Sequence, residues 1–265
     1  MWKFLKYLLA VIMGTFFGLI FFFVIGGAIL AGVISMAMSK SNETEVKKNS
    51  VLVVKLDEEI REKAPSNPFK NFNFMSMTST STLGLNDILD NIRTASNDPK
   101  ISCILLNVGY VKASYETIEE IRDALLEFKA SGKFIIAYSD YYAQSAYYLC
   151  SAADKVYMNP EGILEFRGLA SQLIFFKNTF EKLGITPQPI RHGKYKGAIE
   201  MFANEKMSPE NREQHQVFIN AVWKQICNEI AASRTVETKE LNKVADSLLV
   251  RNADDAVEYR LLDTV

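Results

Sequence analysis

Apolar side chains fill the first forty positions almost without interruption. No charged residue occurs from Tyr7 to Ser39, and Leu, Ile, Phe and Val dominate this run. About 20 apolar residues are enough to cross a bilayer as a helix, so the run predicts one transmembrane helix. The alternative is a cleaved signal peptide with a small-x-small site at Ser35-Met36-Ala37. Because the apolar run is about twice a normal h-region, we expect a retained anchor over residues 1–39.

The charges around this run predict its orientation. Lys3 and Lys6 precede it, which by the positive-inside rule favours a cytoplasmic N-terminus and a single pass. Three more lysines follow within residues 40–50, next to two glutamates, so the asymmetry of charge is small. The 40–50 segment is short and polar, which is typical of a linker.

Beyond residue 50, short apolar runs alternate with amphipathic repeats. We expect strands at 51–56, 101–108, 134–138 and 155–158, and short strands around 163–171. We expect helices at 85–92, 118–128, 143–152, 173–183, 209–233, 238–246 and 252–260. Residues 57–83 are polar and show no clear period, which predicts a long loop. Near-continuous apolar strands that alternate with helices indicate an α/β fold, a parallel sheet covered by helices.

Composition removes several function classes. The net charge of −1 gives no sign of a nucleic-acid partner. The three cysteines form no CxxC pair, so we expect buried thiols rather than disulfides or a zinc site. Only two histidines occur, which leaves little material for a His-based triad or a metal cluster. No nucleotide-binding, nucleophile-elbow or zincin motif is present, and we expect no cofactor.

Residues 191–213 (RHGKYKGAIEMFANEKMSPENRE) are the strongest candidate for chemistry. They contain two lysines one residue apart, Lys194 and Lys196, between two glycines. Ser208 is placed to cap the following helix, with Pro209 as its first residue. By itself, a glycine-framed Lys-Tyr-Lys sequence is typical of a solvated loop.

A family resemblance changes that interpretation. The segment GKYKGAIEMFANEKMSPENREQ resembles the YKSAxEPF…MSPxxRE signature of signal peptide peptidase A, in its long, two-repeat form. The segment KFIIAYSDYYAQSAYYLCSAADKVYMNPEG resembles the YYL-S-ADK-P-G pattern of the same family. The apolar anchor, the VLVVKLDEEI strand and the LGLNDILDNIRTA helix also agree. The resemblance implies a Clp protease/crotonase-like fold, with residues 51–265 as the N-terminal protease repeat.

The resemblance also implies a catalytic role for one residue. The family uses a serine and a lysine, and Lys196 matches the lysine of its YK motif, so we predict Lys196 as the general base. A base must be a neutral amine near physiological pH, because an ammonium cannot accept the serine proton. Burial in an apolar pocket favours the neutral form. Arg191 and Lys194 are expected to face solvent, and Tyr195 and Glu200 to have structural roles.

The nucleophile does not follow the family pattern. Aligning Tyr147 and Tyr148 with the family's paired tyrosines places Gln144 at the serine position. Ser145 lies one residue later and is either a small helix residue or a shifted nucleophile. Residues 107–110 (NVGY) lack the paired glycines that short family members carry after this strand. The sequence therefore also lacks the pattern of a backbone oxyanion site.

These features predict a membrane-anchored Ser/Lys serine endopeptidase repeat that degrades cleaved signal peptides and other hydrophobic peptides. The nucleophile serine is expected on a second repeat beyond Val265. The expected location is the bacterial inner membrane, with the soluble part on the periplasmic side, in a homo-oligomer. One alternative is a catalytically silent membrane scaffold of the same fold. Another is an acyl-CoA hydratase or isomerase of the crotonase group, which needs the oxyanion loop.

Overall fold

The computed structural model describes residues 2–39, 45–64, 72–73, 78–79 and 81–265. The chain divides into two compact units, Met1–Val46 and Lys47–Val265. In its described residues the first unit forms one helix, α1 (Trp2–Ser39), which agrees with the helix expected from the apolar run. Its segment Trp2–Gly32 is long and apolar enough to cross a membrane. At about 1.5 Å per residue, this segment exceeds the roughly 30 Å hydrocarbon core of a bilayer.

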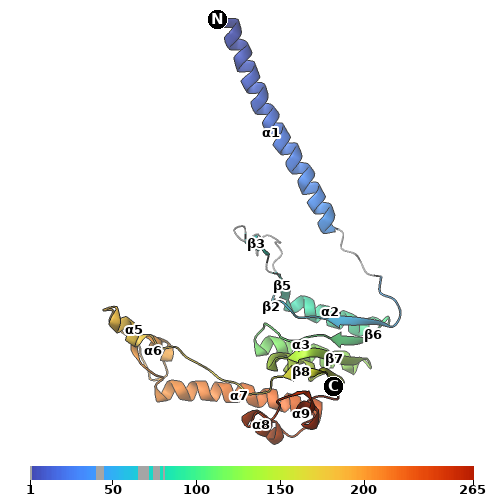
Figure 1. Cartoon of the computed structure of the whole chain (residues 1–265), viewed down its shortest axis with the longest axis vertical. Coiled ribbons are helices and arrows are strands. Elements are labelled where there is room, and N and C mark those ends of the chain that lie inside the picture. The colour runs from blue at the N-terminus through green and yellow to red at the C-terminus, as the bar shows by residue number, and fades with distance from the viewer. Residues whose placement is uncertain (1, 40–44, 65–71, 74–77, 80) are drawn as a thin grey trace. The chain divides into compact units, whose positions relative to one another are not determined.

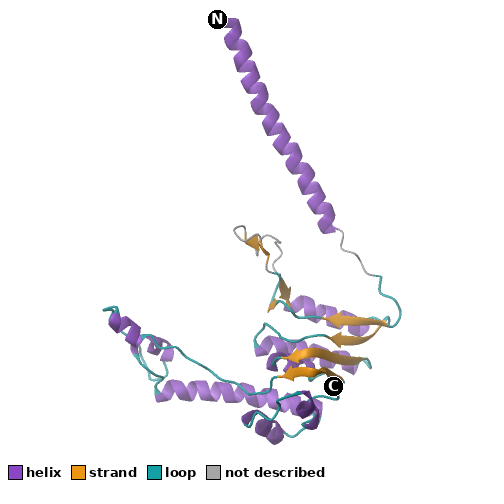
Figure 2. Ribbon diagram, in the orientation of Figure 1, coloured by secondary structure: helices purple, strands orange, loops and turns teal. Residues whose placement is uncertain are grey.

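The second unit is built on a four-stranded parallel sheet (Figure 2). Its strands are β1 (Ser50–Val54), β6 (Ile101–Leu106), β7 (Phe134–Tyr142) and β8 (Lys155–Leu164). They lie in the order β1-β6-β7-β8, and each neighbouring pair is parallel. The predicted α/β class and the parallel sheet are therefore confirmed.

Helices α2 (Leu85–Asn97), α3 (Tyr115–Ala130) and α4 (Gln144–Cys150) pack with this sheet (Figure 1). The apolar side chains of α3 recur at three- and four-residue steps, and they are fully buried: Ile118, Ile121, Leu125 and Phe128. The burial explains why this segment is a helix, because the repeat puts its apolar residues on one face. All three cysteines are free and buried, as expected.

The C-terminal part of the chain forms helices α7 (Pro209–Arg234), α8 (Thr238–Asp246) and α9 (Ala253–Glu258). Only the C-terminal half of α7 contributes apolar side chains to the core, through Ile226, Cys227 and Ile230. The N-terminal half of α7 continues away from the sheet and leads to α5 (Lys177–Lys182) and α6 (Glu200–Ala203) (Figure 1). We call residues 173–222 the arm.

Two secondary-structure predictions are wrong. Residues 57–83 are not a loop throughout, because β2 (Glu59–Arg61) pairs in parallel with β5 (Thr82–Gly84). Within the described part of this segment, β3 (Phe72–Asn73) also pairs antiparallel with β4 (Thr78–Ser79). These strands are two or three residues long, too short to show a hydrophobic period in the sequence.

The short strands expected around 163–171 are also absent beyond the end of β8. Glu165 N–H still bonds to the Tyr142 carbonyl at 2.8 Å, which is the last backbone link to β7. The backbone N–H groups of Arg167 and Gly168 do not continue the ladder and instead donate to the side chain of Gln144. Gly168 then adopts a φ of 83°, a left-handed conformation that ends an extended strand. The helix expected over 173–183 is also shorter, since it covers only Lys177–Lys182.

Candidate active site

Gln144, at the predicted nucleophile position, is the first residue of α4. Its side-chain Oε1 accepts hydrogen bonds from Arg167 N–H and Gly168 N–H, both at 2.9 Å. Its Nε2 donates to the Gly168 carbonyl at 3.0 Å and to the Tyr115 hydroxyl at 3.3 Å. The amide of Gln144 therefore exchanges hydrogen bonds with Gly168 as a neighbouring strand would. An amide held in this way is a structural bridge and has no nucleophilic oxygen.

Ser145, the alternative nucleophile, is half-buried. Its hydroxyl lies 3.5 Å from the carbonyl of Val111, a weak contact to a backbone acceptor. None of the hydrogen bonds found within the described residues joins Ser145 to a lysine, a histidine or a carboxylate. A serine needs an adjacent base to become a nucleophile, so this environment favours the structural role.

The loop after β6 lies tightly against β7. A Cβ atom at Gly109 would be 2.9 Å from the Tyr141 carbonyl oxygen and 3.3 Å from the Ser139 hydroxyl, so only glycine fits there. The Gly109 carbonyl accepts from Ala143 N–H at 2.8 Å, directly before α4. A single glycine in this loop thus serves the approach of two backbone segments.

Lys196 is placed elsewhere, on the arm. It directly precedes the short 3-10 helix η1 (Gly197–Ile199), and its side chain is exposed. It borders a shallow cavity of about 310 Å³, together with Ile190, Arg191, His192, Ala198 and Ile199. Gln144 begins α4, which packs against β7 and β8, whereas Lys196 precedes η1, which packs against α6; Figure 1 shows α6 away from the sheet. Burial of the base, which the chemistry requires, is not provided by this chain's described residues.

A buried carboxylate organises the segment around Lys196, residues 191–200, which we call the lysine loop. Glu200 is only 1% exposed, and it accepts hydrogen bonds from Ser208 N–H at 3.0 Å and from Asn211 Nδ2 at 3.0 Å. The Ser208 hydroxyl donates to it at 2.5 Å, and Arg191 Nη1 donates at 3.2 Å. Burial alone would raise the pKa of Glu200, but the donors from Ser208, Asn211 and Arg191 outweigh it and lower the pKa below its ordinary value. Glu200 is therefore ionised at neutral pH.

Ser208 caps α7 as predicted, with Pro209 as the first helical residue. Its hydroxyl accepts from Asn211 N–H at 3.2 Å, the N-cap hydrogen bond. Lys194 is exposed, as expected. Arg191 is exposed, as expected. Its guanidinium also pairs with the Glu200 carboxylate, a contact that was not predicted.

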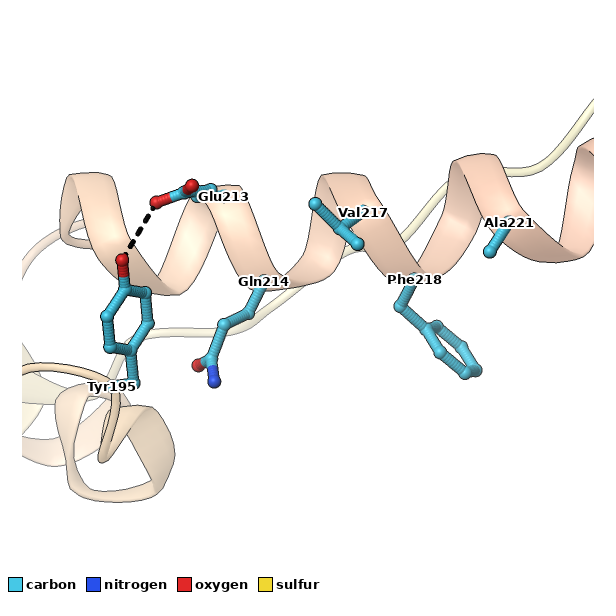
Figure 3. Close-up of a pocket in the computed structure, with 6 residues that line it drawn as sticks. All are labelled: Tyr195, Glu213, Gln214, Val217, Phe218 and Ala221. Atoms are coloured by element: carbon cyan, nitrogen blue, oxygen red, sulfur yellow. Dashed lines mark hydrogen bonds between the residues drawn. The ribbon is translucent and has the colours of Figure 1, made fainter.

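An open groove of about 590 Å³ lies between the lysine loop and α7 (Figure 3). Its lining includes Tyr195, Val217 and Phe218, which are 52%, 64% and 63% exposed. Figure 3 shows the Tyr195 hydroxyl directed at Glu213, to which it donates a hydrogen bond of 3.1 Å. That bond raises the pKa of Tyr195, because the carboxylate stabilises the protonated phenol.

A second groove, of about 610 Å³, was not predicted from the sequence. It lies between residues 169–172, the start of α3 at residues 114–116 and the middle of α7, and most of its exposed lining is apolar. At its edge the Ser171 hydroxyl lies 3.4 Å from His215 Nδ1. The residues come from segments 44 positions apart, so no local pattern in the sequence could have paired them.

The sequence profile of peptidase family S49 matches residues 127–265, which include α4, the arm and the lysine loop. The matched region covers more than half of the chain. The chain belongs to peptidase family S49.

Individual S49 relatives agree with this assignment. Protease 4 of Haemophilus influenzae is 34% identical over 152 residues, which cover 57% of this chain and 25% of the relative. Protease 4 of Salmonella typhi is 30% identical over 187 residues, 68% of this chain and 30% of the relative. The chloroplastic serine protease SPPA of Arabidopsis thaliana is 33% identical over 178 residues, 67% of this chain and 25% of the relative.

This S49 chain therefore spans between 25% and 30% of the length of these three relatives. Among solved structures, a membrane-bound stomatin-specific protease aligns with 82% of this chain and 80% of its own. The sequence identity of that alignment is 12% and its TM-score is 0.43.

Proposed function

We propose that this chain is a membrane-anchored repeat of a Ser/Lys serine protease that degrades cleaved signal peptides and similar hydrophobic peptides, with Lys196 as the general base. The observation that carries the proposal is the S49 match over residues 127–265, which contains the YK motif. The relatives named Protease 4 and serine protease SPPA support the reaction class.

The proposed reaction assigns one proton transfer to this chain. The neutral amine of Lys196 accepts the proton of a serine hydroxyl while the serine oxygen attacks the scissile carbonyl carbon. The resulting ammonium then gives the proton to the leaving amine, which releases the first product and leaves an acyl-enzyme. Water hydrolyses the acyl-enzyme, with the same amine as base.

The serine comes from another S49 repeat in this proposal. Gln144 has no ionisable oxygen, and its amide is fully engaged with Gly168, Arg167 and Tyr115. Lys196 is exposed in this chain, so in the assembled enzyme a surface of the second repeat has to cover it. One contact would then supply both the nucleophile and the low-polarity surroundings of the base.

The arm supports an apolar peptide as substrate. The groove beside Tyr195 presents exposed Val217 and Phe218, and the cavity at Lys196 includes Ile190, which is 99% exposed. Apolar side chains left in water in this way are typical of binding surfaces. The helix α1 supports a site of action at the membrane, where cleaved signal peptides remain. The proposed location is the bacterial inner membrane, in a homo-oligomer.

A silent membrane scaffold is the second candidate, and one observation favours it. The amide of Gln144 fills the nucleophile position with four hydrogen bonds, an arrangement that stabilises the fold without any catalytic group. Under this alternative, Lys196 is an ordinary surface lysine.

The decisive experiment substitutes Lys196→Met in the assembled enzyme, in which the chain is joined to a second S49 repeat that carries the serine. Methionine keeps the apolar stem and removes the amine, so turnover of a fluorogenic apolar peptide should fall by a factor on the order of 10³. Lys194→Met is the matched control, two residues away and also exposed, and should retain most activity. Lys196→Arg should not rescue, because a guanidinium stays protonated. Near-normal turnover of Lys196→Met would refute Lys196 as the base and favour the silent membrane scaffold.

The purified chain alone should hydrolyse no peptide. Turnover by the chain alone that Ser145→Ala abolishes would make Ser145 the nucleophile and would refute this prediction. Orientation is tested with a reporter enzyme fused after Val265. A reporter that works only in the periplasm should be active, whereas activity of a cytoplasm-only reporter would reverse the proposed topology.

A further inference from the structure

Glu200 is the one acidic side chain among the described residues that is almost completely buried, and it lies four residues after Lys196. Ionised carboxylates are very rarely buried unless donors compensate the lost hydration. Glu200 has such donors on both oxygens: Arg191 and the Ser208 hydroxyl on Oε1, and Ser208 N–H and Asn211 on Oε2.

These donors come from both sides of the lysine. Arg191 lies five residues before Lys196, and Ser208 and Asn211 form the cap and first turn of α7. Glu200 thereby fastens the two ends of segment 191–200 to the beginning of a long helix. The Arg191–Glu200 ion pair lies within this segment, and the one further side-chain bond found from the described segment to α7 is the exposed 3.1 Å hydrogen bond from Tyr195 to Glu213.

A packing contact carries this restraint to the residue next to Lys196. A Cβ atom at Gly197 would lie 2.5 Å from Asn211 Oδ1 and 2.6 Å from its Cγ. The backbone at Gly197 therefore rests against the Asn211 amide. That amide is only 6% exposed and donates to Glu200, so its position is fixed. Glu200, Asn211 and Gly197 form a short chain of contacts that ends one residue from the lysine.

Apolar packing cannot supply the same restraint. Residues 191–196 are all exposed, and η1 is only three residues long. A segment with few buried contacts opens easily unless polar contacts hold it. Arg191, the Ser208 cap and Asn211 are such contacts, and all three meet at the Glu200 carboxylate.

We propose that Glu200 is a positioning residue that holds the Lys196 loop in one conformation against α7. This proposal rests on the proposed function only for its catalytic consequence, since the restraint on the loop can be measured without turnover. A displacement of about 1 Å at a catalytic group can cost about 100-fold in rate. A loop that samples several positions should therefore lower kcat without weakening substrate binding to the same extent.

The first test measures hydrogen–deuterium exchange in the full-length chain in detergent micelles. Glu200→Gln keeps the size of the side chain but points an NH₂ group at donors that need an acceptor. We expect amide exchange in residues 192–199 to rise at least about tenfold, while exchange in β6 stays unchanged. Glu205→Gln is the matched control, because Glu205 lies on the same arm and makes a single exposed ion pair, to Lys177. It should leave residues 192–199 unchanged.

If Glu200→Gln also raises amide exchange in β6, the variant has unfolded generally. In that case Arg191→Gln provides the test. Arg191 is 40% exposed in its side chain, so its substitution should be tolerated by the core. We expect a smaller rise in exchange, about threefold, confined to residues 192–199. Unchanged exchange there in Glu200→Gln, or in Arg191→Gln where that variant has to decide, would overturn the proposal.

The second test uses the assembled enzyme. Glu200→Gln should lower kcat about 30-fold or more and change KM less than about threefold. Glu200→Asp, which keeps the charge, should recover part of the loss. A loss confined to KM, or none at all, would overturn the positioning role in catalysis. Retained turnover in Lys196→Met would instead refute the proposed function and leave the exchange result valid, so the two failures are distinguishable.

Discussion

Arg122 connects helix α4, which begins with Gln144, to helix α7, whose other end contacts the Lys196 segment. It is 1% exposed and belongs to α3, yet its guanidinium donates to Tyr148 O at 2.6 Å and to Ser151 Oγ at 2.9 Å, at the end of α4. It also donates to Glu229 O at 3.0 Å and to Ser233 Oγ at 2.6 Å on α7. Its Nε lies 3.3 Å from the Glu229 carboxylate. We predict that Arg122→Met strongly destabilises the fold.

The expected loss follows from what remains after the substitution. Removing one partner of a buried ion pair costs about 3–5 kcal/mol. The Glu229 side chain is 28% exposed and keeps hydrogen bonds from Tyr148 and Gln225, so the lower end applies. A loss of about 3 kcal/mol in the free energy of unfolding should lower the Tm by about 6–12 °C for a unit of this size.

The assay is urea unfolding of the full-length chain in detergent micelles, followed by circular dichroism. Arg93→Met is the matched control, because Arg93 is 57% exposed and its two ion pairs, at 3.9 and 4.0 Å, are long. Exposed pairs contribute about 0–1 kcal/mol. A loss in Arg122→Met within about 1 kcal/mol of that in Arg93→Met would refute the reasoning.

The loss should also depend on pH. Burial and the nearby Glu229 charge raise the pKa values of Glu119 and Asp123, and Arg122 opposes this at Asp123. Without the guanidinium, the pKa of Asp123 should rise further. A carboxyl whose pKa is raised by folding stabilises the fold at low pH and loses that contribution as pH rises through the folded pKa. Arg122→Met should therefore be less destabilised at pH 5 than at pH 8.

Three shorter predictions concern the arm and the core. Ser208→Ala removes the cap of α7 and a donor to Glu200, so it should cost at least about 1 kcal/mol in unfolding free energy and increase hydrogen exchange in the first turn of α7. The pKa of Glu200 is lowered on folding, so its stabilisation is present at neutral pH and is lost as pH falls below about 4.5; exchange in residues 192–199, corrected for intrinsic rates, should rise there. Burial raises the pKa of the Cys227 thiol to about 12, so a thiol reagent should label it at pH 8 only after denaturation.

The sheet and its covering helices were predictable because their apolar residues repeat with a clear period. Helix α3 illustrates both the reach and the limit of that signal. Ile118, Ile121 and Leu125 mark its buried face correctly. Arg122 lies beside them and looks like a surface charge in the sequence, but it is buried. Its partners lie 26 to 111 residues away, and no local pattern contains them.

The candidate site was predictable only in part. The cap at Ser208 depends on neighbouring residues, and the sequence prediction is confirmed. The end of β8 depends on the Gln144 side chain, which binds Arg167 and Gly168 across 23 and 24 residues, so the predicted strands beyond it are wrong. Lys196 as base comes from the resemblance alone and stays a prediction. Its exposure could not be read from the sequence, because burial is a property of the assembled surface.

Helix α7 explains why the two candidate positions lie apart. Arg122 locks its C-terminal half to α4, whose first residue is Gln144. Glu200 locks its first turn to the Lys196 loop. At about 1.5 Å per residue, its 26 residues span about 39 Å, and the helix between the two attachments is continuous. Bending such a helix toward its own core would break one of the two buried networks. In the proposed mechanism, the serine that uses Lys196 therefore approaches the arm from outside this core, as a second S49 repeat could do, whereas Gln144 and Ser145 lie within the core-side helix α4.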